Sequence, residues 1–351
     1  MLKVYDKSEK DEWNKIVKSF QNWDIYYLYE YAYSFMLHGD GDMYLIYFTD
    51  GEERMVYVVM QKDISSSNTF TGLLEPHVYY DWETPYGYGG PLIDDKLSVE
   101  AQQLFEKELK EYCQEHRIVS QFLRFHPLLK NFEVLPELID TRYLRDTIFM
   151  DTEVDAAGIM MNMDSKNRNM VRKAIKNGVT IVKRDITDID EFVQMYNETM
   201  KKHGADEYYT FGHEYFDYLS EMGDNACLFY AMYDGISISS AIIYYNEQYA
   251  HYHLSGSHTA YRKYSPSNLL LYEIACWANK KGIKRFHLGG GMEPDDSLFG
   301  FKKQFNKNGR APFVVGRTIF NRDHYDNLLT LREKADKTFN RNNSFMIQYR
   351  R

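Results

Sequence analysis

CLFYAMYDGISISSAIIYY, residues 227–245, has the pattern of two β-strands joined at Asp234-Gly235. Asp and Gly tolerate the positive φ that a tight hairpin turn needs, and the flanking residues are rich in aromatic and β-branched side chains. MYLIYFTDGEERMVYVVMQ, residues 43–61, repeats this pattern around Asp50-Gly51. The sequence therefore predicts two β-hairpins in distant parts of the chain.

The same elements follow both hairpins in the same order. A loop containing glycine leads to an amphipathic helix, predicted at 98–116 and 267–282, and then to a strand, predicted at 120–127 and 283–290. We treat Arg124-Phe125-His126 and Arg285-Phe286-His287 as equivalent positions in these strands. A duplicated α/β unit explains this order, and a chance match of short apolar strings is the alternative.

The arrangement of elements sets the expected fold class and the domain boundaries. Hairpins without regular βαβ alternation favour a mixed sheet covered by helices, so the class is α+β or mixed α/β. We expect a first domain at 1–150 and a second at 151–317, joined within 151–167. The helix that starts at 318 is too short for a domain, and residues 318–351 are expected to pack back on the first domain.

Composition narrows the class of protein. The 351 residues carry a net charge of -9, which argues against a generic nucleic-acid coat but leaves local basic patches open. The charged start and the lack of a long apolar run predict no signal peptide and no integral membrane segment, so we expect a cytoplasmic protein. Three scattered cysteines, Cys113, Cys227 and Cys276, do not form a disulfide framework or a Cys-rich zinc motif.

A basic helix is predicted at 165–178, with Ser165 as N-cap and Gly178 as C-cap. Arg168, Arg172 and Lys176 follow one another at i, i+4 spacing, so they repel unless an anion lies across them. Their arrangement is typical of a face that binds phosphate or RNA, because arginine makes bidentate contacts with phosphate. A solvated helix face is the other interpretation.

HLGGGMEPDDSLFGFKKQF, residues 287–305, is the densest cluster of chemical groups. Gly289, Gly290 and Gly291 permit close approach of a ligand to backbone N–H groups. Lys302 after Phe301 could stabilise an oxyanion in acyl transfer, and Asp295 or Asp296 could accept a proton. A surface turn with solvated lysines is the alternative.

Two further segments are candidates for ligand contact. Tyr86 and Tyr88 alternate with Gly and Pro in YYDWETPYGYGGPL, residues 79–92, which suits a stacking surface or a packed interdomain loop. RKYSPSN, residues 262–268, begins a helix whose N-terminus could hold an anion. His251 and His253 share a strand face but lack a third ligand nearby, and we expect no metal.

The order of these motifs resembles the Fem-type aminoacyltransferase family. The resemblance runs from about Trp23 to Arg317 and is carried by the segments that have been quoted, together with TMKKHGADEYYTFGHEYFDYL, residues 199–219. It implies two tandem acetyltransferase-like (GNAT-like) domains. It also implies that Lys302, preceded by Phe301, lies near the reacting acyl group, and that Arg172 or Arg168 meets a diphosphate.

The resemblance implies transfer of an aminoacyl group from aminoacyl-tRNA to an amine of a peptidoglycan-precursor peptide, either UDP-MurNAc-peptide or its lipid-linked form. Arg168, Arg172, Lys176, the three glycines, Tyr86 and Tyr88 are then the substrate-binding residues. No cofactor is expected besides the aminoacyl-tRNA co-substrate, and a monomer is compatible with the sequence. The alternative is an N-acyltransferase that uses acetyl-CoA and acts on an envelope glycan or nucleotide-sugar amine. The GNAT phosphate turn is poorly matched here, because Pro266 lacks an N–H and both glycines are absent.

Overall fold

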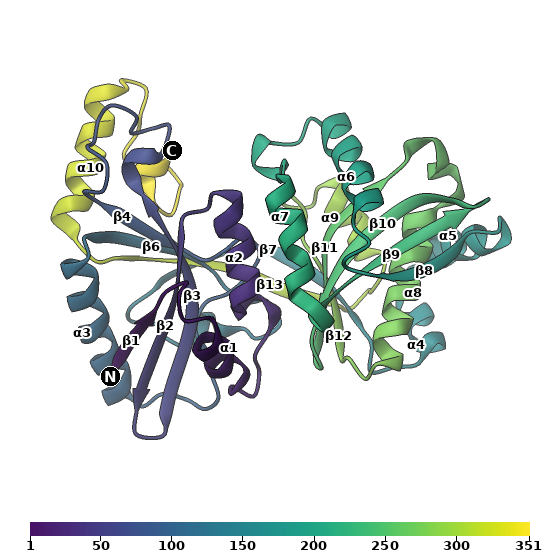
Figure 1. Cartoon of the computed structure of the whole chain (residues 1–351), viewed down its shortest axis with the longest axis horizontal. Coiled ribbons are helices and arrows are strands. Elements are labelled where there is room, and N and C mark those ends of the chain that lie inside the picture. Colours follow the sequence, from purple (N-terminus) through teal and green to yellow (C-terminus); the bar gives the residue numbers. More distant parts are fainter. The chain divides into compact units, whose positions relative to one another are not determined.

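The computed structural model describes residues 1–351, apart from the side chain of His203. The chain divides into two compact units, one of residues 1–144 and 313–351 and one of residues 145–312. We refer to them as unit 1 and unit 2. Each unit is a mixed α/β structure with helices on its sheet (Figure 1), which confirms the predicted fold class. Among the described residues, no helix is both long and apolar enough to span a bilayer.

Unit 1 contains a mostly antiparallel sheet of order β1-β2-β3-β4-β6-β13, with β5 on β3. Its strands are β1 (Leu2–Tyr5), β2 (Asp42–Asp50), β3 (Glu53–Asp63), β4 (Tyr80–Glu83), β5 (Leu92–Ile93), β6 (Ile118–Arg124) and most of β13 (Arg310–Ile319). Its helices are α1 (Lys10–Lys18), α2 (Tyr29–His38), α3 (Val99–Glu115) and α10 (Arg322–Ala335).

Unit 2 repeats this topology with the order β8-β9-β10-β11-β12-β7. Its strands are β8 (Thr180–Asp185), β9 (Ala226–Tyr233), β10 (Ile236–Tyr245), β11 (Tyr249–Ser257), β12 (Arg285–Gly289) and the second half of β7 (Asp140–Asp151). Its helices are α4 (Ala156–Asn162), α5 (Ser165–Lys176), α6 (Asp190–His203), α7 (His213–Tyr218), α8 (Pro266–Lys280) and α9 (Ser297–Lys303).

The two sheets correspond strand by strand. The hairpins β2-β3 and β9-β10 each pair with an antiparallel third strand, and a helix then leads to a strand that runs parallel to the third, β6 beside β4 and β12 beside β11. The turns match the need for positive φ, since Asp234 (φ 51) and Gly235 (φ 75) form one and Gly51 (φ 57) begins the other.

The strand that completes each sheet, β13 in unit 1 and β7 in unit 2, is exchanged between the two halves of the sequence. β7 follows β6 in sequence, but its residues 148–151 pair with β12 in unit 2. β13 follows unit 2, and its residues 315–319 pair with β6 in unit 1. Each sheet is therefore completed by a strand from the other half of the sequence.

Two local predictions need correction. Arg124 ends β6, whereas Arg285 begins β12, so the two Arg-Phe-His strings lie at opposite ends of corresponding strands. Their similarity reflects the common alternation of apolar and polar residues rather than register. In addition, the N-cap of α5 is Asp164, whose backbone is extended, and Ser165 is the first helical residue.

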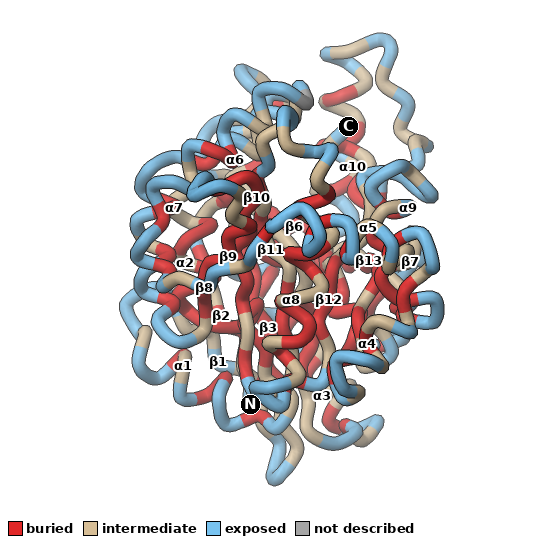
Figure 2. Tube along the Cα trace, turned by 90° about the vertical axis from the view of Figure 1, so that its right-hand side faces the viewer, coloured by how far each residue is buried: buried red, intermediate tan, exposed pale blue. Residues whose placement is uncertain are grey.

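The core of unit 2 forms between β9 to β12 and the apolar face of α8. Figure 2 shows buried residues along β9, β10 and β11, and Ile274, Ala278 and Leu271 of α8 join the same apolar cluster. On the other side, an added Cβ at Gly256 of β11 would lie 2.9 Å from backbone atoms of α6, so this glycine permits close packing of that helix.

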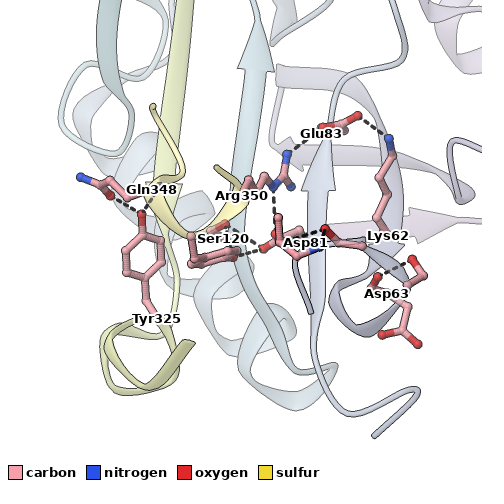
Figure 3. A network of polar contacts seen from close by, with 12 residues as sticks. Lys62, Asp63, Asp81, Glu83, Ser120, Tyr325, Gln348 and Arg350 are labelled. Carbon is pink, nitrogen blue, oxygen red and sulfur yellow. Dashed lines mark hydrogen bonds and ion pairs between the residues drawn. The ribbon is translucent and has the colours of Figure 1, made fainter. Parts of the chain in front are cut away.

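In unit 1, residues that follow β13 complete a separate apolar cluster with β6. Tyr325, Leu328 and Tyr349 pack there against Val119 and Phe70. Figure 3 shows the polar network at its edge, where Arg350 donates from Nε to Asp81 (3.0 Å) and from Nη1 to Glu83 (2.7 Å). Segment 344–351 is thereby held to strand β4.

Candidate functional site

A cavity of about 460 Å³ lies in unit 2 at the N-terminus of α8. Residues from α5, α6, α8, α9, the end of β11 and the 3₁₀ turn Thr259–Tyr264 form its walls. The lining residues are Lys166, Met170, Lys202, Tyr252, Ser257, His258, Thr259, Arg262, Ser265, Pro266, Ser267, Asn268, Phe301 and Gln304.

The cavity is basic. Lys166, Lys202 and Arg262 contribute three cations, and among the described residues no aspartate or glutamate lines it. Anions are favoured here also by the first turn of α8, a helix of 15 residues whose N-cap side chain makes no capping hydrogen bond. The cavity is therefore suited to a ligand that carries phosphate groups.

The strands below the cavity diverge. β11 and β12 pair in parallel at three positions, which end at His251 and His287, and β11 then continues to Ser257. A bulge at His253, between the paired residues Tyr252 and Leu254, marks the same part of β11. Because the ladder stops there, backbone groups of β11 beyond the bulge are not used by β12 and an extended ligand can enter beside them.

The backbone around Ser265 explains how α8 begins at the cavity. Ser265 has φ 58, and Pro266 occupies the first helical position, where its missing N–H costs no helical hydrogen bond. Asn268 in the first turn donates to Asn167 of α5 (2.7 Å), a bond that fixes α5 beside the opening of α8.

The corresponding helix in unit 1 has an occupied N-terminus. The carboxylate of Glu53 accepts hydrogen bonds from the backbone N–H (3.1 Å) and the hydroxyl (2.8 Å) of Ser98, the N-cap of α3. An internal carboxylate thus fills the place where an anionic ligand would bind. Of the two related helix starts, the one in unit 2 is the open one.

Lys302 lies next to the cavity on α9. Its side chain is 8 % exposed, and Nζ donates to the carbonyl of Gly290 (2.7 Å). The ring of Tyr252, a lining residue, is centred 6.0 Å from Nζ. Burial lowers the pKa of Lys302 to about 8, against an opposing effect of Asp296. An ammonium group with this pKa is a ready proton donor near neutral pH.

The glycine turn and α9 are held together by Asp296. This residue is the N-cap of α9, and its carboxylate accepts from the backbone N–H groups of Phe299 (2.7 Å), Met292 (2.6 Å) and Glu293 (3.1 Å). Burial raises the pKa of Asp296, but these bonds outweigh it and leave the pKa below its usual value. A carboxylate engaged in this way is a weak base, so its geometry supports a positioning role.

The other candidate residues of segment 287–305 differ in their surroundings. Asp295 is exposed with φ 53, and Phe301 lines the cavity while its ring meets Phe305 edge to face at 5.2 Å. Gly289 ends β12 with φ 73, and an added Cβ at Gly291 would lie 2.1 Å from the Asp296 carboxylate. The turn thus needs glycine for conformation at one position and for space at another.

The basic stripe of α5 does not line the cavity. Lys166 and Met170 line it, whereas Arg168, Arg172 and Lys176 centre about 140° away around the helix axis. Arg168 donates to the carbonyl of Met163 (2.6 Å), and Arg172 and Lys176 are exposed. Helical spacing groups the stripe correctly, but it does not say which polar face meets the cavity.

Tyr86 and Tyr88 lie in unit 1, within a cluster of aromatic rings. Tyr88 contacts Tyr26 and Phe313 edge to face at 5.5 and 5.4 Å, and the carbonyl of Tyr86 accepts from the hydroxyl of Tyr31. His253, in unit 2, bonds through Nε2 to the Tyr215 hydroxyl (2.7 Å), and burial lowers its pKa to about 3.

Sequence reasoning missed several residues of the cavity, among them Lys202, Tyr252 and His258. The segment 262–268, by contrast, was singled out, and it forms one wall. Lys166, in the first turn of α5, belongs to the basic patch that the sequence indicates for phosphate binding. No local pattern indicates Lys202, because it comes from a separate helix, α6.

Unit 1 contains a second cavity, of about 430 Å³. Its charged groups pair with one another, as Arg350 does with Asp81 and Glu83, and Lys62 does with Glu83 (2.8 Å). We therefore place the candidate site at the basic cavity of unit 2.

Comparison with known proteins agrees with this choice. The family model of the acetyltransferase (GNAT) domain matches residues 165–303, which contain the basic cavity, Lys302 and α5. FemX, a solved structure, is 16 % identical and superposes with a TM-score of 0.68, over 93 % of this chain and 99 % of that chain. The chain has the Fem-type tandem GNAT fold.

This tandem GNAT fold is shared with other solved structures. The C-terminal domain of a putative lysylphosphatidylglycerol synthetase from Agrobacterium fabrum is 14 % identical, with a TM-score of 0.57, over 91 % of this chain and 94 % of that chain. L-PGS from Bacillus licheniformis is 14 % identical, with a TM-score of 0.53, over 83 % of this chain and 88 % of that chain. No curated protein matches the chain. The GNAT domain confirms the predicted acyltransferase class.

Proposed function

We propose that the protein is a Fem-type aminoacyltransferase. It moves an aminoacyl group from aminoacyl-tRNA to an amine of a peptidoglycan-precursor peptide, supplied as UDP-MurNAc-peptide or as its lipid-linked form. The observation that carries this proposal is the buried Lys302 beside an open, basic cavity in the GNAT domain. The fold shared with FemX supports the Fem type, and the donor and acceptor are those that the resemblance of the motifs implies.

In the proposed reaction, the neutral acceptor amine attacks the ester carbonyl of the donor. The new C–N bond forms, the C–O bond to ribose breaks, and the proton lost by the amine ends on the ribose oxygen. Protonated Lys302 stabilises the negative charge that develops on oxygen and donates to the leaving group. Its amine then takes up the proton released by the acceptor, so the enzyme returns to its starting state.

The candidate residues of segment 287–305 have distinct parts in this proposal. Phe301 forms the cavity wall next to Lys302, and Asp296 fixes the turn of Gly289, Gly290 and Gly291 on which Lys302 bonds. Asp295 is exposed near this turn and is the freer of the two carboxylates to accept a proton through water.

Replacement of Lys302 tests the proposal. With aminoacyl-tRNA and UDP-MurNAc-pentapeptide, Lys302→Met should lower the rate of transfer by at least about 100-fold, the usual loss when an oxyanion donor is removed. The adjacent exposed Lys303→Met is the matched control and should keep the wild-type rate. Equal rates for both variants would remove Lys302 from the mechanism.

An acyl-CoA dependent N-acyltransferase is the second candidate, because the matched family model is that of an acetyltransferase. The basic cavity could hold the phosphates of CoA, although Pro266 removes one N–H from the first turn of α8. Thermal unfolding with UDP-MurNAc-pentapeptide, UDP-GlcNAc and acetyl-CoA separates the two candidates. A shift with acetyl-CoA alone would favour this second function.

A further inference from the structure

Helix α5 concentrates positive charge without any neutralising partner. Lys166, Arg168, Arg172, Lys173 and Lys176 lie within 12 residues, and the helix contains no acidic residue. Among side chains that the structure describes, none of the five forms an ion pair. This density contrasts with the net charge of -9 of the whole chain.

The five cations share the exposed half of α5. At 100° per residue they fall on an arc of about 160°, opposite the buried residues Asn167, Val171 and Ala174. The helix is about 18 Å long, so its outer face is a continuous basic ridge rather than a point charge. Like charges at this spacing repel one another, which favours an extended polyanion over a single small anion.

The ridge leads to the basic cavity. Lys166, at the first turn of α5, is a member of the ridge and also lines the cavity. Asn167 of the same turn bonds to Asn268 of α8, which fixes the distance between the ridge and the cavity. A polyanion that lies along α5 can therefore place its end in the cavity.

We infer that α5 is the docking surface for the double-helical stem of the RNA donor, with the single-stranded 3′ end of that RNA entering the cavity. This inference rests on the proposed function and deepens it. Lysine and arginine contact the phosphate backbone without reading sequence. Arg168, Arg172 and Lys176 then serve the donor RNA rather than the diphosphate of the acceptor.

A double-stranded RNA fits this surface better than an anionic membrane does. Helices that insert into membrane interfaces present a free apolar face beside the basic one. The apolar face of α5 is instead occupied, because Val171 and Ala174 belong to the core of unit 2. Ile175 is the large exposed apolar side chain of α5, 53 % exposed, and it lies at the edge of the cationic arc rather than on a separate apolar face.

The test uses a matched pair of variants of the full chain. Arg172→Gln/Lys173→Gln/Lys176→Gln removes three exposed cations from the ridge, and glutamine is a good helix former. The control, Lys280→Gln/Lys281→Gln/Lys284→Gln, removes three exposed cations at the opposite end of α8, about 22 Å from the cavity end. Both variants change the net charge equally, and thermal melts show whether each is folded.

Binding of an RNA hairpin with a single-stranded 3′ overhang is measured by fluorescence anisotropy at several salt concentrations. The ridge variant should bind the hairpin at least about tenfold more weakly than the wild type. The slope of its log Kd against log salt concentration should be smaller than that of the wild type by about 2 to 3, because three phosphate contacts are removed. The control and wild type should agree. Equal affinity and slope for the ridge variant, or an equal loss in the control, would overturn the inference.

Two parallel measurements separate the inference from the proposed function. Vesicles that contain phosphatidylglycerol replace the hairpin in one arm, and a loss confined to vesicles would assign the ridge to a membrane and overturn the RNA assignment. Transfer by the wild type from aminoacylated RNA is measured in the other arm. Hairpin binding through α5 without any transfer would uphold the docking surface and overturn the proposed function, whereas transfer with an unaffected ridge variant would do the opposite.

Discussion

At the scale of single residues, the burial of Lys302 lowers the pKa of its ammonium group, and this pKa sets the pH range in which the group can assist transfer. Its pKa of about 8 leaves roughly nine in ten molecules protonated at pH 7, because burial disfavours the ammonium form only in part. If the ammonium group assists transfer, the rate with a saturating acceptor should fall as pH rises through 8. A pH–rate profile checks this, and a rate that keeps rising to pH 9.5 would show that the ammonium form is not needed.

The same pKa shift affects folding. The folded-state value lies below the usual 10.5 of lysine, so between pH 8 and 10.5 the unfolded chain binds more protons than the folded one. The contribution of Lys302 to the free energy of unfolding therefore becomes more favourable as pH rises through this window. Lys302→Met should remove that increment.

Asp296 is the second residue whose position determines a measurable effect. Asp296→Ala removes three backbone bonds to its carboxylate and should lower the free energy of unfolding by about 1 to 2 kcal/mol. Since Asp296 raises the pKa of Lys302, the falling limb of the pH–rate profile should also move to lower pH.

Asp295→Asn is the control for this variant, because asparagine tolerates the left-handed backbone of position 295 (φ 53). Its free energy of unfolding should stay within about 0.5 kcal/mol of wild type. A similar loss of stability in both variants would contradict the capping role of Asp296. Chemical denaturation measures both.

At the scale of elements, segment 344–351 fixes strand β4 through charge. Burial alone would raise the pKa of Glu83, but Lys62 and Arg350 outweigh this effect and hold it at about 2. Because the folded-state pKa lies below the usual value of 4.5, the stabilisation from Glu83 is complete above that pH and is lost as pH falls towards 2. β4 leads directly into the loop that carries Tyr86 and Tyr88.

Arg350→Met tests this anchor. It leaves Asp81 and Glu83 buried with one cation fewer and should cost roughly 3 kcal/mol in the free energy of unfolding at pH 7. Arg322→Met breaks an exposed i, i+4 pair with Asp326 and should cost less than about 0.5 kcal/mol. Urea titrations of both variants give the comparison, and equal costs would show that segment 344–351 does not anchor β4.

The sequence predicts elements better than it predicts their contacts. The hairpins at Asp50-Gly51 and Asp234-Gly235 and the helices at 98–116 and 267–282 follow from local patterns, and the structure contains them. Which polar face of α5 meets the cavity does not follow, because 3.6-residue periodicity separates buried from exposed but does not rank exposed positions. The capping bonds of Asp296 also depend on a turn whose backbone no spacing rule specifies.

At the scale of the whole molecule, the order of elements in the sequence predicts the repeat, but it does not predict the exchange of β7 and β13. Nothing in the composition of 140–151 or 310–319 indicates that the first pairs with β12 and the second with β6. Partner choice depends on side-chain packing over long sequence separations.

The exchange predicts where the chain can be divided. A fragment of residues 145–312 keeps the part of β7 that pairs with β12, whereas 152–312 leaves Phe286 and Leu288 on an unpaired edge. The longer fragment should melt cooperatively as a monomer, and the shorter one should aggregate. Size-exclusion chromatography and circular dichroism distinguish them, and identical behaviour would show that β7 is dispensable.

The exchanged strands also bear on how the protein is made. On the ribosome, β6 emerges long before β13, because 185 residues separate Arg124 at the end of β6 from Arg310 at the start of β13. At 5 to 20 residues per second, this interval lasts about 9 to 37 s. During that time β6 in the nascent first half lacks its partner β13, so the sheet of unit 1 is completed only after unit 2 has been synthesised. The unpaired edge of β6 is therefore most exposed to aggregation, and most in need of chaperones, during this interval.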